Sequence, residues 1–147
     1  MIKLFVSDID GTLFDHTVGV PKENVDALLK LQEKDVKIVL ASGRAIPAMM
    51  EIADRIHLKA NKGYIIASNG AEVFDLSKGE YIHQALIPLN TLKEIYTFCM
   101  KNNLYFSCVQ DDVLYCSYYD RAIEHEKYHG NFKIKHIAML RNKETRH

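Results

Sequence analysis

Two aspartates near the N-terminus are the first residues of the chain whose spacing suggests chemistry. Asp8 and Asp10 follow the short apolar run 2–7 and precede Gly11 and Thr12. Residues two apart in a strand point to the same face, so both carboxylates would face one ligand. Such a pair can bind a hard divalent cation such as magnesium. It can also divide the work of phosphoryl transfer, because one carboxylate can attack phosphorus while the other protonates the leaving oxygen.

The same aspartates have a purely structural interpretation. Asp and Gly are common in turns, so Asp8 and Asp10 could simply end a strand. With either interpretation, Gly11 would let the chain turn sharply, and Thr12 would tie the loop through its hydroxyl. The apolar strand before the pair and the Thr-Leu sequence after it favour the chemical interpretation.

The elements around this pair follow a β-α-β-α-β pattern. Continuous apolar runs predict strands at 2–7, 36–41 and 63–67, and helical spacing of apolar residues predicts helices over 21–34 and 46–56. Each strand ends in a polar turn. Right-handed crossovers place the carboxyl ends of parallel strands at one edge of a sheet, so the three turns should line one crevice.

The pattern changes after the third strand. A hairpin with its turn at 77–79 leads to a run with the order helix, strand, strand, helix, strand, which is a different architecture. We therefore expect two domains, 1–87 with three parallel strands plus the hairpin, and 88–147. The expected elements are strands 72–75 and 80–86, helix 88–103, strands 104–109 and 113–118 around the turn 110–112, helix 120–129 and strand 133–137.

Bulk composition excludes several classes of function. Hydrophobic residues make up 48% and charged residues 26% of 147 residues, which is typical of a globular chain. The formal net charge is zero, so no basic field indicates nucleic acid or anionic lipid as a partner. No segment reaches the roughly 20 apolar residues of a membrane helix, and the cytoplasm is the expected location. The three cysteines lack CxxC spacing, which favours reduced thiols.

The three polar turns, taken in order, resemble the haloacid dehalogenase (HAD) superfamily. The sequence 8–12, DIDGT, is similar to its first motif, and 41–44, ASGR, is similar to its second. The third turn, 68–71 (SNGA), looks like that of the Cof-type branch of sugar-phosphate phosphatases, which carries a large α/β cap. The resemblance implies an α/β fold, with a partial HAD Rossmann-like parallel sheet over 1–87 and part of an α+β cap over 88–147.

This resemblance implies a role for each residue of the first two turns. Asp8 would be the nucleophile and a magnesium ligand. Asp10 would be the general acid and base, and would reach Mg²⁺ through its backbone carbonyl. The backbone N–H groups of Ile9 and Asp10, the hydroxyl of Ser42 and the amide of Gly43 would bind the phosphoryl oxygens. The implied activity is that of a hydrolase, a phosphatase acting on a small phosphorylated metabolite.

Arg44 and Asn69 leave two interpretations each. Arg44 could touch the substrate phosphate, or it could be a solvated residue or a cap on the second helix. Asn69 could bind or orient the nucleophile loop, or it could simply adopt the positive φ that a turn requires.

Two further groups of residues suggest chemistry but favour plain structural roles. A histidine pair at i, i+4 spacing could hold a metal, although a solvated helix face explains it better. A group of tyrosines could stack on a base or sugar, although packing is the better explanation without a basic patch nearby. These residues are His125 and His129, and Tyr115, Tyr118, Tyr119 and Tyr128.

The sequence departs from the family in its later motifs. The expected lysine and the acidic GDxxND pair are not found, and Lys133 and Lys135 alternate with apolar residues along a predicted strand. We therefore expect a chain truncated within the cap, with little or no phosphatase activity. The alternatives are an inactive remnant or a module that binds phosphate or a partner without turnover. The first strand would lack a neighbour, so self-association through the exposed sheet edge is a further expectation.

Overall fold

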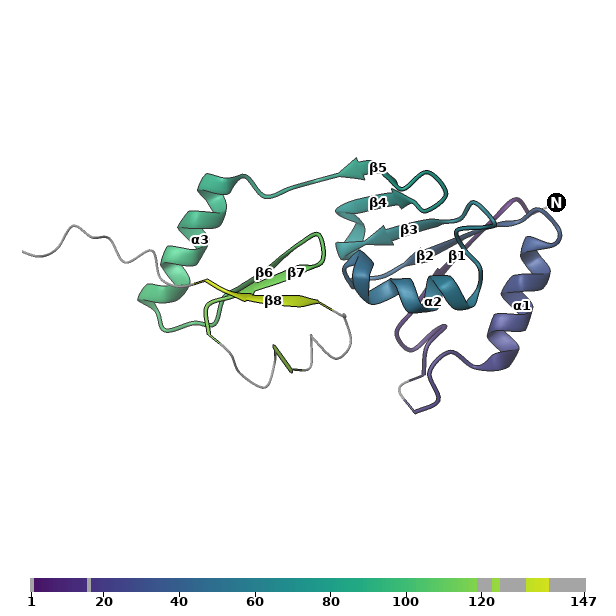
Figure 1. Ribbon diagram of the computed structural model, residues 1–147, viewed down its shortest axis with the longest axis horizontal. Coiled ribbons are helices and arrows are strands. Elements are labelled where there is room, and N and C mark those ends of the chain that lie inside the picture. The colour runs from purple at the N-terminus through teal and green to yellow at the C-terminus, as the bar shows by residue number, and fades with distance from the viewer. Residues whose placement is uncertain (1, 16, 119–122, 125–131, 138–147) are drawn as a thin grey trace, which may run out of the picture. The chain divides into compact units, whose positions relative to one another are not determined.

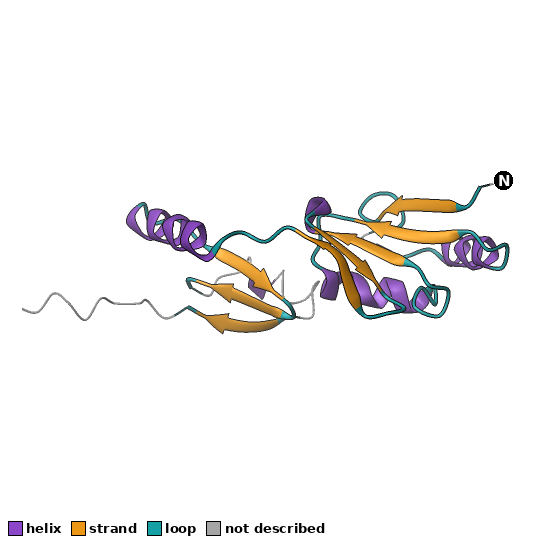
Figure 2. Cartoon of the chain, turned by 90° about the horizontal axis from the view of Figure 1, so that it is seen from above, coloured by secondary structure: helices purple, strands orange, loops and turns teal. Residues whose placement is uncertain are grey.

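The computed structural model of the protein describes residues 2–15, 17–118, 123–124 and 132–137. The chain divides into two compact units, Met1–Leu86 and Ile87–His147, and each is described by itself (Figures 1 and 2). Among the described residues, no helix is long and apolar enough to cross a bilayer.

A five-stranded sheet forms the centre of the first unit, with the strands in chain order (Figure 1). The first three strands are parallel and the last two are antiparallel, as the apolar runs and the hairpin predict. Asp8 lies opposite Ala41, and Ala41 lies opposite Ile66, so the three parallel strands end at the same sheet edge. The strands are β1 (Leu4–Asp8), β2 (Lys37–Ala41), β3 (Tyr64–Ala67), β4 (Glu72–Asp75) and β5 (Glu80–Gln84).

The helices of this unit agree with the prediction except at one point. α1 (Lys22–Gln32) begins after Pro21, as expected. The helix predicted over 46–56 is instead a 3₁₀ turn, η1 (Ile46–Met49), followed by the short α2 (Met50–Arg55). Its first turn closes with a bond from the Ala48 N–H to the Ala45 carbonyl at 3.0 Å. Such i to i+3 closure is common where a helix begins.

The core of the first unit lies between the sheet and these helices. Ile38 and Leu40 of β2 and Ile65 of β3 are almost fully buried, and they cluster with Met49 and Ile56. Burying each of these side chains stabilises the fold by roughly 1.5–3 kcal/mol. The core therefore holds β2 and β3 firmly behind the polar turns.

β1 is much less covered than its neighbours. Leu4, Phe5 and Val6 are 53%, 39% and 50% exposed, and they alternate between the two faces of the strand. Among the described strands, β1 pairs only with β2. Parallel strands are normally covered on both faces, whereas β1 exposes apolar side chains and pairs on one side among the described strands. The bare apolar edge expected from the sequence is therefore present.

The second unit contains one helix and a three-stranded sheet. α3 (Leu89–Lys101) precedes β6 (Ser107–Gln110), β7 (Val113–Cys116) and β8 (Lys133–His136). β6 and β7 form the predicted hairpin, and β8 runs parallel to β7. Residues 123–124 are helical, and the rest of the predicted helix 120–129 lies outside the described residues, with His125 and His129.

One predicted strand begins later than expected. Leu104 does not start a strand, because its N–H bonds back to the Cys99 carbonyl at 2.8 Å and closes the end of α3. Asn103 supplies the positive φ for this closure, at +53°. Phe106 packs edge-on against Tyr96 of α3, with ring centroids 5.4 Å apart. Helix capping and packing therefore override the strand preference of these residues.

Two of these tyrosines lie against other side chains of the second unit. Tyr118 packs edge-on against Tyr105, and the Tyr115 ring lies 5.8 Å from the Lys135 ammonium nitrogen. Tyr119 and Tyr128 lie outside the described residues.

A buried carboxylate organises the turn between β4 and β5. Asp75 is only 3% exposed, and its Oδ1 accepts bonds from the Ser77 hydroxyl at 2.7 Å, the Ser77 N–H at 2.9 Å and the Lys78 N–H at 3.1 Å. The Ser77 hydroxyl, followed by these backbone donors and the Lys78 charge, lowers the pKa of the Asp75 carboxyl. These bonds favour the ionised form of the carboxyl.

This lowered pKa predicts acid sensitivity of folding. The folded-state pKa lies below its usual value of 3.8, so Asp75 stabilises the fold above that value and loses its contribution as pH falls through the folded-state pKa. We expect Asp75→Asn to reduce the loss of unfolding free energy between neutral and acid pH, measured by urea titration. Asp54→Asn, at an exposed carboxylate of α2, is the control and should leave that slope unchanged. Equal slopes for Asp75→Asn and the unmodified chain would contradict the prediction.

Candidate functional site

The carboxylate loop begins where β1 ends and is anchored by the residue between the aspartates. Ile9 is fully buried, whereas Asp8 and Asp10 are exposed. The Ile9 carbonyl accepts bonds from the backbone N–H groups of residues 12–14, at 3.2, 2.9 and 2.8 Å. The loop therefore folds tightly around Ile9 and presents both aspartates to solvent.

Gly11 and Thr12 behave as the sequence predicts. Gly11 has φ +73°, a conformation that glycine adopts at little cost. The Thr12 hydroxyl donates to Asp8 Oδ2 at 3.1 Å and ties the loop to the carboxylate.

The second turn follows β2 and lies beside the carboxylate loop. Ser42 comes directly after Ala41, the register partner of Asp8. The Ser42 hydroxyl oxygen accepts a bond from the Arg44 N–H at 3.2 Å, so its own hydrogen can donate to a ligand. Gly43 lies against the side chain of Asn69, where an added Cβ would be 3.0 Å from Oδ1. The absence of a side chain at Gly43 therefore allows the two turns to pack closely.

The third turn is bonded to the second through the backbone. The Asn69 N–H donates to the Ser42 carbonyl at 3.3 Å, and the Ser68 N–H donates to the Arg44 carbonyl at 2.9 Å. Both Ser68 and Asn69 have positive φ, at +53° and +56°. The structural interpretation of Asn69 is confirmed, and a role in orienting the nucleophile loop stays a prediction.

Arg44 makes an ion pair that the sequence does not reveal. Its Nε and Nη2 donate to the two carboxylate oxygens of Asp10, at 2.9 and 2.5 Å. The guanidinium also lies over the Phe14 ring, 5.0 Å from its centroid, and Nη1 donates to the Ala48 carbonyl at 3.4 Å. The side chain is only 17% exposed. The interpretation as a solvated residue is therefore wrong.

The helix-cap interpretation of Arg44 is also wrong. Ala45 is the N-cap of η1, and no side chain caps this end. Arg44 instead contacts Asp10, 34 residues earlier in the chain. No local pattern indicates a contact over that separation, since it depends on the register of β1 with β2.

The donor set of the site suits a hard cation. Asp8 and Asp10 offer oxygen ligands, and Mg²⁺ is commonly held by one or two carboxylates together with water and substrate phosphates. Asp8 can offer its carboxylate, whereas the Asp10 carboxylate is bonded to Arg44, so Asp10 would use its backbone carbonyl. Among the described residues, no group of three or more His, Cys, Asp or Glu side chains is placed to hold a metal.

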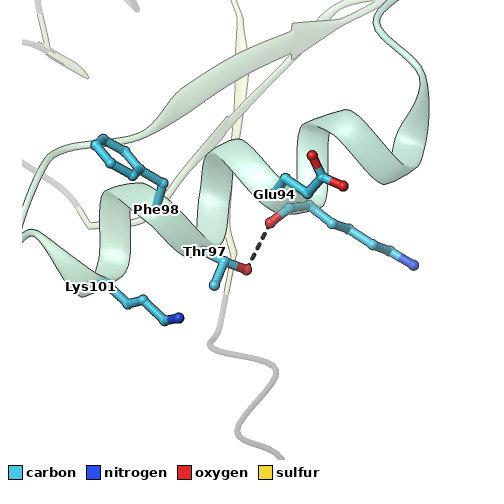
Figure 3. Close-up of a pocket in the computed structure, with 5 residues that line it drawn as sticks. Glu94, Thr97, Phe98 and Lys101 are labelled. Carbon is cyan, nitrogen blue, oxygen red and sulfur yellow. Dashed lines mark hydrogen bonds between the residues drawn. The ribbon is translucent and has the colours of Figure 1, made fainter.

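A surface hollow elsewhere does not involve these residues. It lies on α3 and is lined by side chains of that helix alone (Figure 3). The only bond drawn there joins the Thr97 hydroxyl to the Lys93 carbonyl, at 2.8 Å. Its lining residues are Lys93, Glu94, Thr97, Phe98 and Lys101.

The family of the chain follows from its comparison with known proteins. Residues 5–147 match the model of the haloacid dehalogenase-like hydrolases, and the chain belongs to this family. A haloacid dehalogenase-like hydrolase from Bacteroides thetaiotaomicron has the same fold, with a TM-score of 0.87 at 22% identity over 95% of this chain and 53% of that one. The resemblance drawn from the three turns is thereby confirmed.

Two of the proteins that the chain is similar to are named as phosphatases. Phosphatase YwpJ of Bacillus subtilis is 28% identical over 114 residues, which are 78% of this chain and 39% of the relative. An HMP-PP phosphatase of Escherichia fergusonii is 34% identical over 90 residues, which are 60% of this chain and 31% of the relative. The chain thus spans less than half the length of these relatives.

The contact between Gly43 and Asn69 predicts a measurable coupling. A methyl group at residue 43 must displace Asn69, so Gly43→Ala should lower the unfolding free energy by about 1 kcal/mol or more. In an Asn69→Ala background the clashing atom is absent, and the same change should cost clearly less. Urea unfolding of the four chains gives the coupling energy. Additive costs would show that Asn69 does not constrain Gly43.

Proposed function

We propose that the chain carries the nucleophile half of a magnesium-dependent phosphatase that acts on a small phosphorylated metabolite. The observation that supports this most directly is the placement of Asp8 and Ser42 on the turns of two paired parallel strands, in a chain of the haloacid dehalogenase-like family. The names of the relatives support the same activity. The three turns favour the Cof-type branch within this family.

The first chemical step is in-line attack on the phosphoryl group. Thr12 holds Asp8 Oδ2, and Asp8 Oδ1 attacks phosphorus while the bond to the ester oxygen breaks. The Ser42 hydroxyl and the N–H groups of Ile9, Asp10 and Gly43 stabilise the phosphoryl oxygens. Mg²⁺, when bound at Asp8 and the Asp10 carbonyl, neutralises charge on the transferring group.

Asp10 moves the protons in both steps. It donates a proton to the leaving ester oxygen, which departs as an alcohol. It then takes a proton from the water that attacks phosphorus, and inorganic phosphate leaves while the Asp8 carboxylate is regenerated. Arg44 and Asn69 complete the phosphate side of the site, Arg44 as a donor to phosphoryl oxygens and Asn69 by holding the second turn.

The rate expected of this chain is low. The described residues bring two carboxylates to the site, which would anchor a metal ion weakly. Metal-assisted transfer gains several kcal/mol from a well-anchored ion, so this chain would lose part of that gain. A chain that binds phosphate without turnover is the alternative function, and the same turns would serve it.

Replacement of the nucleophile separates these functions. With p-nitrophenyl phosphate and Mg²⁺, we expect slow hydrolysis by the unmodified chain and a loss of at least about a hundredfold with Asp8→Asn. Asp15→Asn, a change in the same loop that leaves Asp8 and Asp10 intact, is the matched control. Hydrolysis that survives Asp8→Asn would exclude Asp8 as the nucleophile. Phosphate binding without any hydrolysis would favour the binding module.

We also propose that the chain self-associates through β1. The apolar residues of this strand are exposed in every copy, and two copies of one edge strand are complementary to each other when they pair antiparallel about a twofold axis. Such pairing would satisfy backbone groups along β1 and cover part of Leu4, Phe5 and Val6.

A charge placed on β1 tests this association. We expect the mass measured by light scattering to rise with protein concentration, and Val6→Lys to suppress that rise because the charge would be buried at the paired edge. Leu89→Lys makes a similar change on α3, at a residue that is 64% exposed, and should not alter the mass. A single-chain mass at every concentration of the unmodified protein would rule out the association.

A further inference from the structure

The pairing of Arg44 with Asp10 conflicts with the role of Asp10 in catalysis. Both carboxylate oxygens accept bonds from Arg44, one from Nε and one from Nη2. A carboxyl group that transfers a proton must present one of these oxygens to the ester oxygen of the substrate. With both oxygens bonded to the guanidinium, the Asp10 carboxylate is held toward Arg44 instead.

The guanidinium is anchored by groups other than Asp10. Its face covers the Phe14 ring and its Nη1 donates to the Ala48 carbonyl. The backbone of Arg44 is also fixed, because its N–H bonds to Ser42 and its carbonyl accepts from Ser68. Arg44 can therefore keep its position while its Nε and Nη2 donors exchange one hydrogen-bond acceptor for another.

Asp10 is the more exposed member of the pair. Its side chain is 40% exposed, against 17% for Arg44. A phosphate group offers the same geometry to a guanidinium as a carboxylate does, since each presents two oxygens to the forked N–H groups. A phosphate bound between Asp8 and Ser42 would lie beside the turn that carries Arg44, and would compete with Asp10 for the same two donors.

We propose that Arg44 exchanges Asp10 for the phosphoryl oxygens when a phosphomonoester binds. In the free protein, Arg44 holds the Asp10 carboxylate. In the complex, Arg44 binds phosphate and Asp10 is released toward the ester oxygen. This inference rests on the proposed phosphatase site, and it makes Arg44 a positioning residue for Asp10 in addition to a phosphate ligand.

The exchange predicts that Asp10 weakens phosphate binding through Arg44. In a calorimetric titration with inorganic phosphate and Mg²⁺, Asp10→Ala should tighten binding roughly tenfold. The same change in an Arg44→Ala background should tighten binding by no more than about twofold, because only the loss of a negative charge remains. The Arg44→Ala background is thus the control for the charge effect.

A direct measurement covers the case in which Arg44→Ala does not fold. Arg44→Lys retains a cation, and the cycle with Asp10→Ala can be repeated on it, where a smaller coupling is expected because lysine lacks the fork. In the unmodified chain, the Arg44 Nε–H resonance should shift when phosphate is added, and Asp10→Ala alone should also shift it.

The outcomes separate this inference from the proposed function. If Asp10→Ala raises the affinity for phosphate equally in both backgrounds, the exchange is wrong. The exchange is also wrong if phosphate binds and the Arg44 resonance does not shift. Either result would leave the proposed phosphatase site unaffected. No binding of phosphate by any of the chains would overturn both. If Asp10→Ala raises the affinity for phosphate strongly only when Arg44 is present, the exchange is supported.

Discussion

The burial of Ile9 is the constraint on which the rest of the site depends. Its side chain enters the core and its carbonyl collects three backbone N–H groups, so the residues on either side of it must face solvent. Full burial of an isoleucine side chain stabilises the fold by roughly 1.5–3 kcal/mol. This stabilisation fixes the loop conformation that places both carboxylates at the end of β1. The core residue therefore sets the geometry of the loop, and Asp8 and Asp10 need no contact with each other.

The second and third turns are held by a different means. Backbone bonds between Ser42, Arg44 and the 68–69 turn join the ends of β2 and β3, and Gly43 lets the Asn69 side chain pack against the chain. Two residues with positive φ are accepted at this point, at a cost of order 1–3 kcal/mol each outside glycine. The hydrogen bonds between the second and third turns, together with the burial of β2 and β3 behind them, offset this cost.

Most of the secondary structure can be predicted from local patterns, whereas the contacts of Arg44 cannot. The apolar runs of β2 and β3, the hairpin turn at 77–79 and the turn at 110–112 each follow from residues close in sequence. The start of α2 and the stretch 104–106 depend on how helix ends close, so simple periodicity places them wrongly. The site residues follow from the resemblance to a family, but the partner of Arg44 is fixed by strand register and packing on Phe14.

The exposure of β1 bears on how rigid the nucleophile can be. A strand with neighbours on both sides would hold Asp8 through two hydrogen-bonded ladders, whereas β1 pairs with β2 alone among the described strands. The position of Asp8 therefore depends on the bonds of its own loop, from Thr12 and from the groups around the Ile9 carbonyl. The Asp10–Arg44 pair also joins this loop to the second turn through side chains. If a bound phosphate displaces Asp10 from Arg44, the phosphate itself must connect the carboxylate loop to the second turn. Ligand binding would then replace the contact that it breaks.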